Sequence, residues 1–301
     1  MKCYDLMLIG PATRDENIDF SGEVVREIGG AAFFGVFAAA CSGADVCAAV
    51  KCSGQDTDMQ RAFELDDDHF FLLPSAETTR MRNTYFTADR ERRKTECVVQ
   101  SDPISPEEIP QVDCRHYHLA GLLYGDFQET MIPYLKQRGT VSADLQGFLR
   151  HNQNGSMLFQ DWTGKKEYLP YLDVLKADTA EAEILTGTAD REEAARIMHS
   201  WGAKEILISN HAEMLVYDGT HFHSKPVTAR NLSGRTGRGD TVFASYLARR
   251  LKGEEPEDAL GFATAAVSMK MEKPGPLRSG EREIRARMKE DMQNLMKSDN
   301  F

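Results

Sequence analysis

The chain has 301 residues and a formal net charge of −11, from 36 basic and 47 acidic side chains. At roughly 150 residues per domain, this length fits one large α/β domain as well as two domains. Apolar residues make up 41% and charged residues 28%, which is typical of a folded globular protein and not of a disordered one. The acidic balance argues against a nucleic-acid or anionic-membrane surface, because such surfaces demand clustered Lys and Arg, but it permits a local pocket for a small anion.

Targeting and redox features predict a cytoplasmic protein. The N-terminal apolar stretch is short and is broken by Asp5 and Pro11, so it does not match a signal peptide. No run approaches the ~18 apolar residues of a membrane span. None of the six cysteines belongs to a C-x-x-C pair, so reduced thiols are expected and not zinc ligands or disulfides.

Short β-rich apolar runs alternate with helical patterns along most of the chain. Strands are expected at 6–9, 46–50, 117–119, 141–143, 174–177, 206–208 and 214–217, with helices at 31–41, 129–138 and 192–201. Strands separated by helices imply right-handed crossovers and a mainly parallel sheet that is covered on both faces. The expected fold class is α/β.

Residues 78–100 break this alternation. They carry Thr, Tyr, Phe, Val and many charges, with a turn expected at 88–91 and a further strand beside them at 18–25. The pattern predicts a polar hairpin with one apolar and one wet face. Such a flap suits a lid over a ligand, and a surface hairpin without a function explains the pattern equally well.

The C-terminal segment predicts a helix with one apolar face. Ile284, Met288, Met292 and Met296 recur every four residues. That spacing places them on one side of the helix, where a methionine stripe is more often a packing face than a cofactor site.

The segment 233–241 (SGRTGRGDT) carries the clearest chemical signal. Its glycines allow a tight turn just before an amphipathic helix, whose free N–H groups and dipole favour an anion. Asp240 in the first turn is placed to accept a proton from a hydroxyl, although a role as a helix cap is open as well. No G-x-x-x-x-G-K-[ST] motif occurs, and no G-x-G-x-x-G motif follows the first strand.

These residues carry a resemblance to a known family. Residues 234–240 resemble the D-T-x-G-A-G-D signature of the ribokinase-like (PfkB) carbohydrate kinases. Further landmarks follow in the family's order, namely GPATRD at 10–15, the glycine pair at 29–30, DLQGFLR at 144–150, KADTAE at 176–181 and LTG at 185–187. The likeness spans residues 4 to about 276, and residues 102–104 with 144–150 look closest to the myo-inositol kinase-like branch.

The resemblance implies one ribokinase-like kinase domain over residues 1–301, a three-layer α/β/α unit with a mainly parallel sheet and lid strands near 16–26 and 78–100. It implies ATP-dependent phosphorylation of a hydroxyl on a sugar or polyol, with Asp240 as base and Gly237, Arg238 and Gly239 as the anion hole. Family members often dimerise through the lid, so a homodimer is an open option.

The resemblance also assigns the remaining site residues. Asp15, Gly29 and Gly30 would bind the substrate. The ATP site would include Asp144, Gln146, Arg150, Asp178, Glu181, Arg235 and Thr236, with Ala265, Ala266 and Gly275 at the adenine. Glu181, and Asp178 through water, would hold Mg²⁺.

Several positions depart from the family pattern. Gly234 replaces the first Asp of the signature, and His211 and Met214 replace two glycines of a turn beside the nucleotide. Nucleotide affinity or the choice of phosphoryl donor is therefore expected to differ. Arg235 and Arg238 either add positive charge next to the phosphates or are solvated surface residues. A nucleoside kinase of the same fold and a catalytically weak binding protein are the alternative functions.

Overall fold

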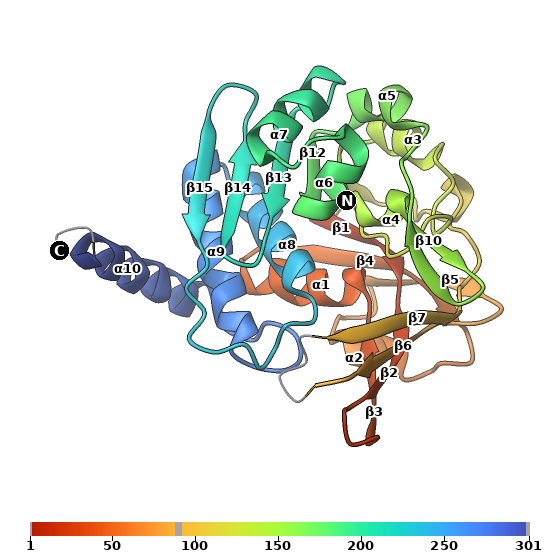
Figure 1. The fold of residues 1–301 in the computed structure, drawn as a ribbon. Helices are drawn as coiled ribbons and strands as arrows, with labels where there is room; N and C mark the ends of the chain where they lie inside the picture. Colours follow the sequence, from red (N-terminus) through yellow and green to blue (C-terminus); the bar gives the residue numbers. More distant parts are fainter. Residues whose placement is uncertain (1, 88–91, 299–301) are drawn as a thin grey trace.

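The computed structural model describes residues 2–87 and 92–298, and its core is a sheet of nine strands. Their order is β15-β14-β13-β12-β9-β8-β1-β4-β5 (Figure 1). The strands are β1 (Cys3–Pro11), β4 (Val46–Ser53), β5 (Phe70–Ser75), β8 (Asp113–Leu119), β9 (Thr140–Asp144), β12 (Val174–Asp178), β13 (Glu205–Ser209), β14 (Glu213–Tyr217) and β15 (Phe222–Pro226). All neighbours pair in parallel except β13–β14 and β14–β15, which confirms the predicted α/β class.

Helices cover both faces of this sheet. Alternate residues of β1 point to opposite sides, so Leu6 and Leu8 belong to one hydrophobic core and Met7 and Ile9 to the other. The first core packs under α1 (Ala31–Cys41), α8 (Arg238–Leu251) and α9 (Pro256–Met271), and the second under α3 (Met131–Lys136), α6 (Thr179–Thr186) and α7 (Arg191–Ser200). Shorter helices are α2 (Met59–Phe63), α4 (Gln146–Leu149), α5 (Lys165–Tyr168), η1 (Pro106–Glu108) and η2 (Leu169–Tyr171). Across the described ranges, no helix is long and apolar enough to cross a membrane.

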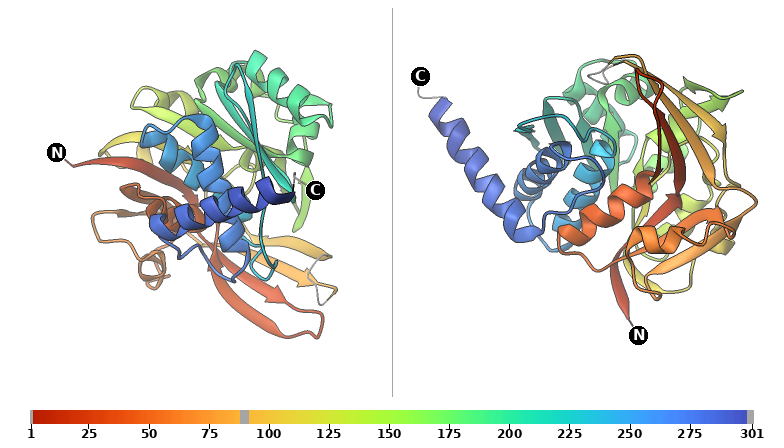
Figure 2. Two further views of the ribbon diagram at one scale, coloured as in Figure 1. Left: turned by 90° about the vertical axis from the view of Figure 1, so that its left-hand side faces the viewer. Right: turned by 90° about the horizontal axis from the view of Figure 1, so that it is seen from below.

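A second sheet of six strands lies beside the first, in the order β10-β11-β7-β6-β2-β3 (Figures 1 and 2). Its strands are β2 (Thr13–Ile18), β3 (Val24–Gly29), β6 (Thr79–Tyr85), β7 (Arg93–Val99), β10 (Arg150–Gln153) and β11 (Ser156–Phe159). The polar hairpin expected at 78–100 is present as β6 and β7, and its expected turn at 88–91 lies outside the described residues. A continuous strand over 18–25 is wrong, because Asp19 accepts hydrogen bonds from the N–H groups of Ser21 and Glu23 and turns the chain there. The strands expected near 16–26 are β2 and β3 on either side of this turn, and β2 pairs with β6.

The C-terminal helix α10 (Glu281–Ser298) projects from the body of the molecule (Figures 1 and 2). Ile284 is fully buried and Met288 is partly buried, but Met292 is 48% exposed and Met296 is 61% exposed. The predicted packing face is therefore correct only for the first half of the stripe, because the helix extends past the surface against which it packs.

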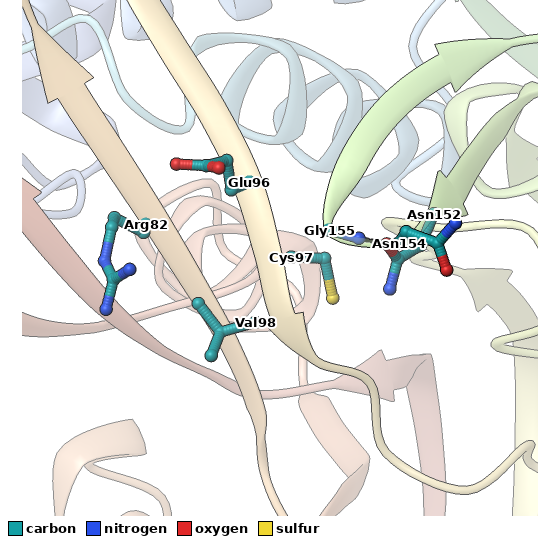
Figure 3. Close-up of a pocket in the computed structure, with 7 residues that line it drawn as sticks. All are labelled: Arg82, Glu96, Cys97, Val98, Asn152, Asn154 and Gly155. Carbon is teal, nitrogen blue, oxygen red and sulfur yellow. Dashed lines mark hydrogen bonds between the residues drawn. The ribbon is translucent and has the colours of Figure 1, made fainter.

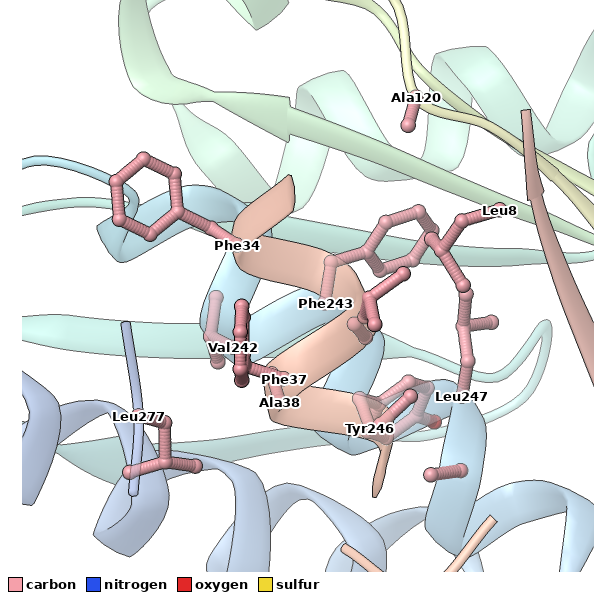
Figure 4. Packing of buried hydrophobic residues seen from close by; sticks show 14 of the residues in the cluster. Leu8, Phe34, Phe37, Ala38, Ala120, Val242, Phe243, Tyr246, Leu247 and Leu277 are labelled. Atoms are coloured by element: carbon pink, nitrogen blue, oxygen red, sulfur yellow. The ribbon is translucent and has the colours of Figure 1, made fainter. Parts of the chain in front are cut away.

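The packing of α1 against α8 fixes where α8 begins. Phe34 and Phe37 of α1 and Val242 and Phe243 of α8 belong to the first hydrophobic core, together with Leu8 of β1 (Figure 4). Burying side chains of this size stabilises the contact by roughly 1.5–3 kcal/mol each. The N-terminal end of α8, which carries the Gly-rich segment, is thereby held against a rigid part of the fold.

Candidate active site

A cleft of about 1310 Å³ is lined by both sheets and by the start of α8. β9 and β12 end at this cleft with Asp144 and Asp178, as expected for a ligand site at the carboxyl edge of an open α/β sheet. Fourteen of the predicted site residues line it: Asp15, Gly30, Asp144, Gln146, Arg150, Asp178, Glu181, Arg235, Thr236, Gly237, Arg238, Gly239, Asp240 and Gly275. Residues from six separate stretches of the sequence thus meet at one site.

Three predicted residues do not line the cleft. Ala265 and Ala266 lie in α9, are at most 3% exposed and belong to the first hydrophobic core, so the prediction that they form an adenine pocket is wrong. Gly29 ends β3, where an added Cβ would come within 2.6 Å of Oδ2 of Asp15. Its lack of a side chain leaves room for that carboxylate.

The start of α8 combines a glycine turn with a carboxylate. Gly237 has φ 78°, and an added Cβ there would lie 2.3 Å from the Phe34 ring, so both conformation and space demand glycine. Asp240 follows in the first helical turn, and burial, together with the nearby Asp144, raises its pKa to about 6. Among the described residues, no group donates a hydrogen bond to its carboxylate. The site therefore presents a carboxylate that can take up a proton near neutral pH.

The sequence analysis did not predict the buried side chain of Lys176 beside Asp240. The Nζ atom of Lys176 lies 2.9 Å from Oδ2 of Asp144 and 3.9 Å from Oε2 of Glu181. Burial alone would lower the pKa of Lys176, but Asp144, Glu181 and Asp240 raise it, so the ammonium form persists. The ammonium group offsets the mutual repulsion of these three carboxylates.

Asp178 and Glu181 form a reciprocal cap at the start of α6. Asp178 accepts a hydrogen bond from the N–H group of Glu181 at 2.8 Å, and Oε2 of Glu181 accepts one from the N–H group of Asp178 at 2.7 Å. Burial raises the pKa of Glu181 to about 7. This pair of carboxylates fits a divalent cation such as Mg²⁺, which prefers oxygen ligands. A bound cation would also favour the ionised form of the buried Glu181.

One end of the cleft offers buried oxygen atoms without partners. Within residues 2–87 and 92–298, Oδ1 of Asp15 and Oγ1 of Thr13 are buried and accept or donate no hydrogen bond. Burial raises the pKa of Asp15 to about 6. Asn83 and Thr95 of the second sheet also line this end, and the Thr95 hydroxyl donates to Oδ1 of Asn83 at 2.8 Å. This set of groups fits a ligand with several hydroxyls.

Basic side chains line the cleft at the start of α8. Burial lowers the pKa of Arg238, while Asp178 opposes this shift, and Arg235 lies nearby. At the end of β13, Oδ1 of Asn210 accepts two backbone hydrogen bonds at 2.7 Å and forms a tight turn that places exposed His211 on the cleft. Met214 instead points into the first hydrophobic core.

A smaller cavity of about 530 Å³ lies on the second sheet beside the turn between β10 and β11 (Figure 3). It is lined by Arg82, Glu96, Cys97, Val98, Asn152, Asn154 and Gly155. Over the described part of the chain it shares no lining residue with the cleft, so it forms no part of the site discussed above.

The ordered motifs and this cleft agree with a comparison against protein families. The family described as "pfkB family carbohydrate kinase" matches residues 118–282. The chain belongs to the pfkB family of carbohydrate kinases. The predicted family and the assignment of the chain as an enzyme are thereby confirmed.

Solved structures support the same assignment for this kinase. It is 34% identical, with a TM-score of 0.84, to a pyrophosphate-dependent kinase of the ribokinase family complexed with a pyrophosphate analog and myo-inositol, and the match covers 92% of this chain and 99% of that one. It is 33% identical, with a TM-score of 0.83, to a pyrophosphate-dependent myo-inositol-1 kinase converted into a myo-inositol-3 kinase by two substitutions, over 95% of this chain and 99% of that one. These neighbours confirm the predicted likeness to the myo-inositol kinase-like branch.

A cytidine kinase of Thermococcus kodakarensis is 32% identical to this kinase over 123 residues. The match covers 36% of this chain and 44% of that protein. The chain therefore spans less than half the length of this curated relative, and the likeness supports kinase chemistry on either a carbohydrate or a nucleoside.

Proposed function

We propose that this kinase transfers a phosphoryl group from pyrophosphate to a hydroxyl of myo-inositol or a closely related cyclic polyol, with Asp240 as general base. The observation that carries the proposal is the position of Arg235 and Arg238 at the start of α8, beside Asp240, in a cleft that also holds the unpartnered Oδ1 atom of Asp15. The donor would lie against the two arginines and the acceptor against Asp15, with Asp240 between them.

The proposed step balances as a single displacement. The polyol oxygen forms a bond to the terminal phosphorus, the bridging P–O bond breaks, and orthophosphate leaves with its electron pair. Asp240 accepts the hydroxyl proton, while the N–H groups at the start of α8 stabilise charge on the transferred group. Asp178 and Glu181 would hold Mg²⁺, which when bound neutralises part of the phosphate charge.

Pyrophosphate is proposed as the donor in place of the ATP that the sequence analysis expects. ATP needs a surface for adenine, and Ala265 and Ala266 lie in the core instead. His211 adds a side chain at the rim, where the resemblance places a glycine beside the nucleotide. Pyrophosphate requires only cations and N–H groups, which Arg235, Arg238 and the start of α8 supply.

The acceptor end fits a polyol because Asp15 and Thr13 present buried oxygen atoms that need partners. An unpaired buried polar group costs about 1–3 kcal/mol, and a hydroxyl-rich ring would satisfy several such groups at once. Asn83 and Thr95 add an amide and a hydroxyl from the second sheet.

Steady-state kinetics over a matrix of donors and acceptors test this function. Pyrophosphate and ATP are each offered with myo-inositol, ribose and cytidine, and the phosphate ester is detected by mass spectrometry. We expect the highest kcat/KM for pyrophosphate with myo-inositol. A higher value for ATP refutes the proposed donor, and a higher value for cytidine refutes the proposed acceptor.

The pH dependence of kcat/KM follows from the raised carboxylate pKa values. Asp15 and Asp240 have pKa values of about 6 and Glu181 of about 7, each raised by burial, and the mechanism needs their ionised forms. We therefore expect kcat/KM to be level above about pH 8 and to fall as the pH decreases through 7 and then 6. A profile that stays level down to pH 5 contradicts this assignment.

A further inference from the structure

Lys270 lies in the last turn of α9 and points its ammonium group at the Gly-rich segment. The residue is 2% exposed. Its Nζ atom donates a hydrogen bond to the carbonyl oxygen of Gly234 at 2.7 Å and a second one to the carbonyl oxygen of Thr236. The same ammonium group lies 5.3 Å from the centre of the Phe34 ring. Among the described residues, the buried Lys270 ammonium group thus makes its hydrogen bonds only to backbone carbonyls and its ring contact only to one aromatic face.

This arrangement has the chemistry of a monovalent cation site. Carbonyl oxygens and a ring face are dipolar and quadrupolar groups that stabilise a single positive charge without neutralising it. Burial lowers the pKa of Lys270 to about 8, while Asp240 and Glu27 oppose that shift, so the side chain carries its charge at pH 7. The ammonium group is covalently tied to α9 and cannot dissociate as a free ion would.

The backbone at residue 234 leaves no room for a side chain that could bind a free cation. An added Cβ on Gly234 would lie 1.8 Å from the carbonyl oxygen of Lys273, which no small adjustment removes. The N–H group of Gly234 donates to the carbonyl oxygen of Met271 at 2.8 Å. The end of α9 therefore holds this segment on one side through the backbone and on the other through the Lys270 ammonium group.

The carbonyls that Lys270 binds come directly before the anion-binding turn. Thr236 precedes Gly237, whose left-handed conformation opens α8 and its free N–H groups. If the carbonyl of Thr236 turned away, the peptide that supplies the next N–H group would rotate with it, because the peptide unit is planar. The Lys270 ammonium group consequently fixes the orientation of the start of α8 from outside the helix.

We propose that Lys270 is a positioning residue whose ammonium group serves as a built-in monovalent cation for residues 234–236, so that phosphoryl transfer needs no free K⁺ or NH₄⁺. The inference rests on the proposed function of the cleft, because it assigns this loop to the donor phosphates. It adds a residue to which the motifs assign no role.

The test measures phosphoryl transfer in buffers whose only monovalent cation is choline, then with K⁺ or NH₄⁺ added. We expect the wild-type rate to be the same in all three. Lys270→Met, which keeps the length of the side chain without its charge, is expected to lose roughly 10²-fold in kcat/KM, as misplacement of reacting groups by about 1 Å does. Lys270→Ala leaves a hole, and added NH₄⁺ or K⁺ is expected to restore much of its activity.

Controls separate positioning from folding and from the proposed function. Lys273→Ala removes an exposed lysine three residues after Lys270 and is expected to leave activity and cation response unchanged. Circular dichroism and melting curves establish that each variant is folded. A wild-type enzyme that requires K⁺, a fully active Lys270→Met variant, or a folded Lys270→Ala variant that no cation rescues overturns the inference.

Failure of the proposed function gives a different result. If the wild type transfers no phosphoryl group from pyrophosphate, the melting temperature with and without pyrophosphate still reports on the loop. If pyrophosphate raises the melting temperature of the wild type equally in choline and in K⁺, the result supports a built-in cation. If pyrophosphate raises it only when K⁺ is present, the result contradicts the inference. Wild-type measurements alone can therefore still overturn the inference even if both Lys270 variants fail to fold.

Discussion

Replacing Asp240 by asparagine is expected to lower kcat by ~10²-fold or more. The asparagine has nearly the same shape, but its amide cannot accept the proton of the attacking hydroxyl. Because the substitution leaves Arg235, Arg238 and the N–H groups at the start of α8 in place, the affinity for pyrophosphate should change little. Single-turnover rates and the KM for pyrophosphate, measured at pH 7.5, distinguish a slower chemical step from weaker binding.

Asp258→Asn is the matched control for this substitution. Asp258 is also an aspartate in the first turn of a helix, but it is exposed at the start of α9 and does not line the cleft. Its replacement is expected to leave kcat unchanged. An Asp240→Asn enzyme as fast as the wild type contradicts the assignment of Asp240 as base, and a large rise in the pyrophosphate KM with unchanged kcat assigns it to binding.

Replacing Lys176 by methionine is expected to lower the free energy of unfolding by about 3–5 kcal/mol, the usual cost of breaking a buried ion pair. The change leaves the buried carboxylates of Asp144 and Glu181 without the ammonium group that lies 2.9 and 3.9 Å from them. Urea denaturation with an unchanged m-value measures the loss. Adding Asp144→Asn to Lys176→Met should recover part of it, because one buried negative charge is then removed.

Lys136→Met tests whether burial and not the mere loss of an ion pair causes this effect. Lys136 also pairs with a carboxylate, Asp173, but that carboxylate keeps a second partner in Lys204 at 2.8 Å. We expect a loss of about 1 kcal/mol or less. If Lys176→Met costs no more than Lys136→Met, the buried network at the cleft does not stabilise the fold.

The main sheet was predictable because its strands are continuous apolar runs between helical patterns. The second sheet was only partly predictable. Strands β10 and β11 have only four residues each, and the sequence analysis did not predict them. They pair across the two-residue turn Asn154-Gly155, so a local hairpin signal was present and was missed. The end of α10 was mispredicted because the stripe of Met288, Met292 and Met296 does not reveal where the supporting surface stops.

The site was predictable where a motif is local in the sequence. Asp240 and its glycines stand within one turn of a helix start, and their spacing alone indicates an anion site. Lys176 was within a quoted motif, yet only the fold shows that its ammonium group meets Asp144, 32 residues away. Lys270 has no local signal, because its role depends on a loop that precedes it by 34 and 36 residues.

Ala265 and Ala266 were assigned to the site, although they lie in the first hydrophobic core. The resemblance alone assigned them to the adenine, and small residues on a helix equally suit close packing between helices. The tertiary fold decides between these roles, and here α8 packs closely on α9. Asn83 and Thr95 of the second sheet line the cleft. The polar hairpin at 78–100 suggested a lid, but its pattern did not indicate which of its side chains face the cleft.

Phosphorus NMR of the enzyme with Mg²⁺, pyrophosphate and myo-inositol tests the central claim most directly. The proposed function predicts that the pyrophosphate resonance is replaced by one orthophosphate and one phosphomonoester signal of equal area. Orthophosphate alone would mean that water and not the polyol accepts the phosphoryl group. An unchanged pyrophosphate signal, with ester formation only after ATP is added, would contradict the proposed donor.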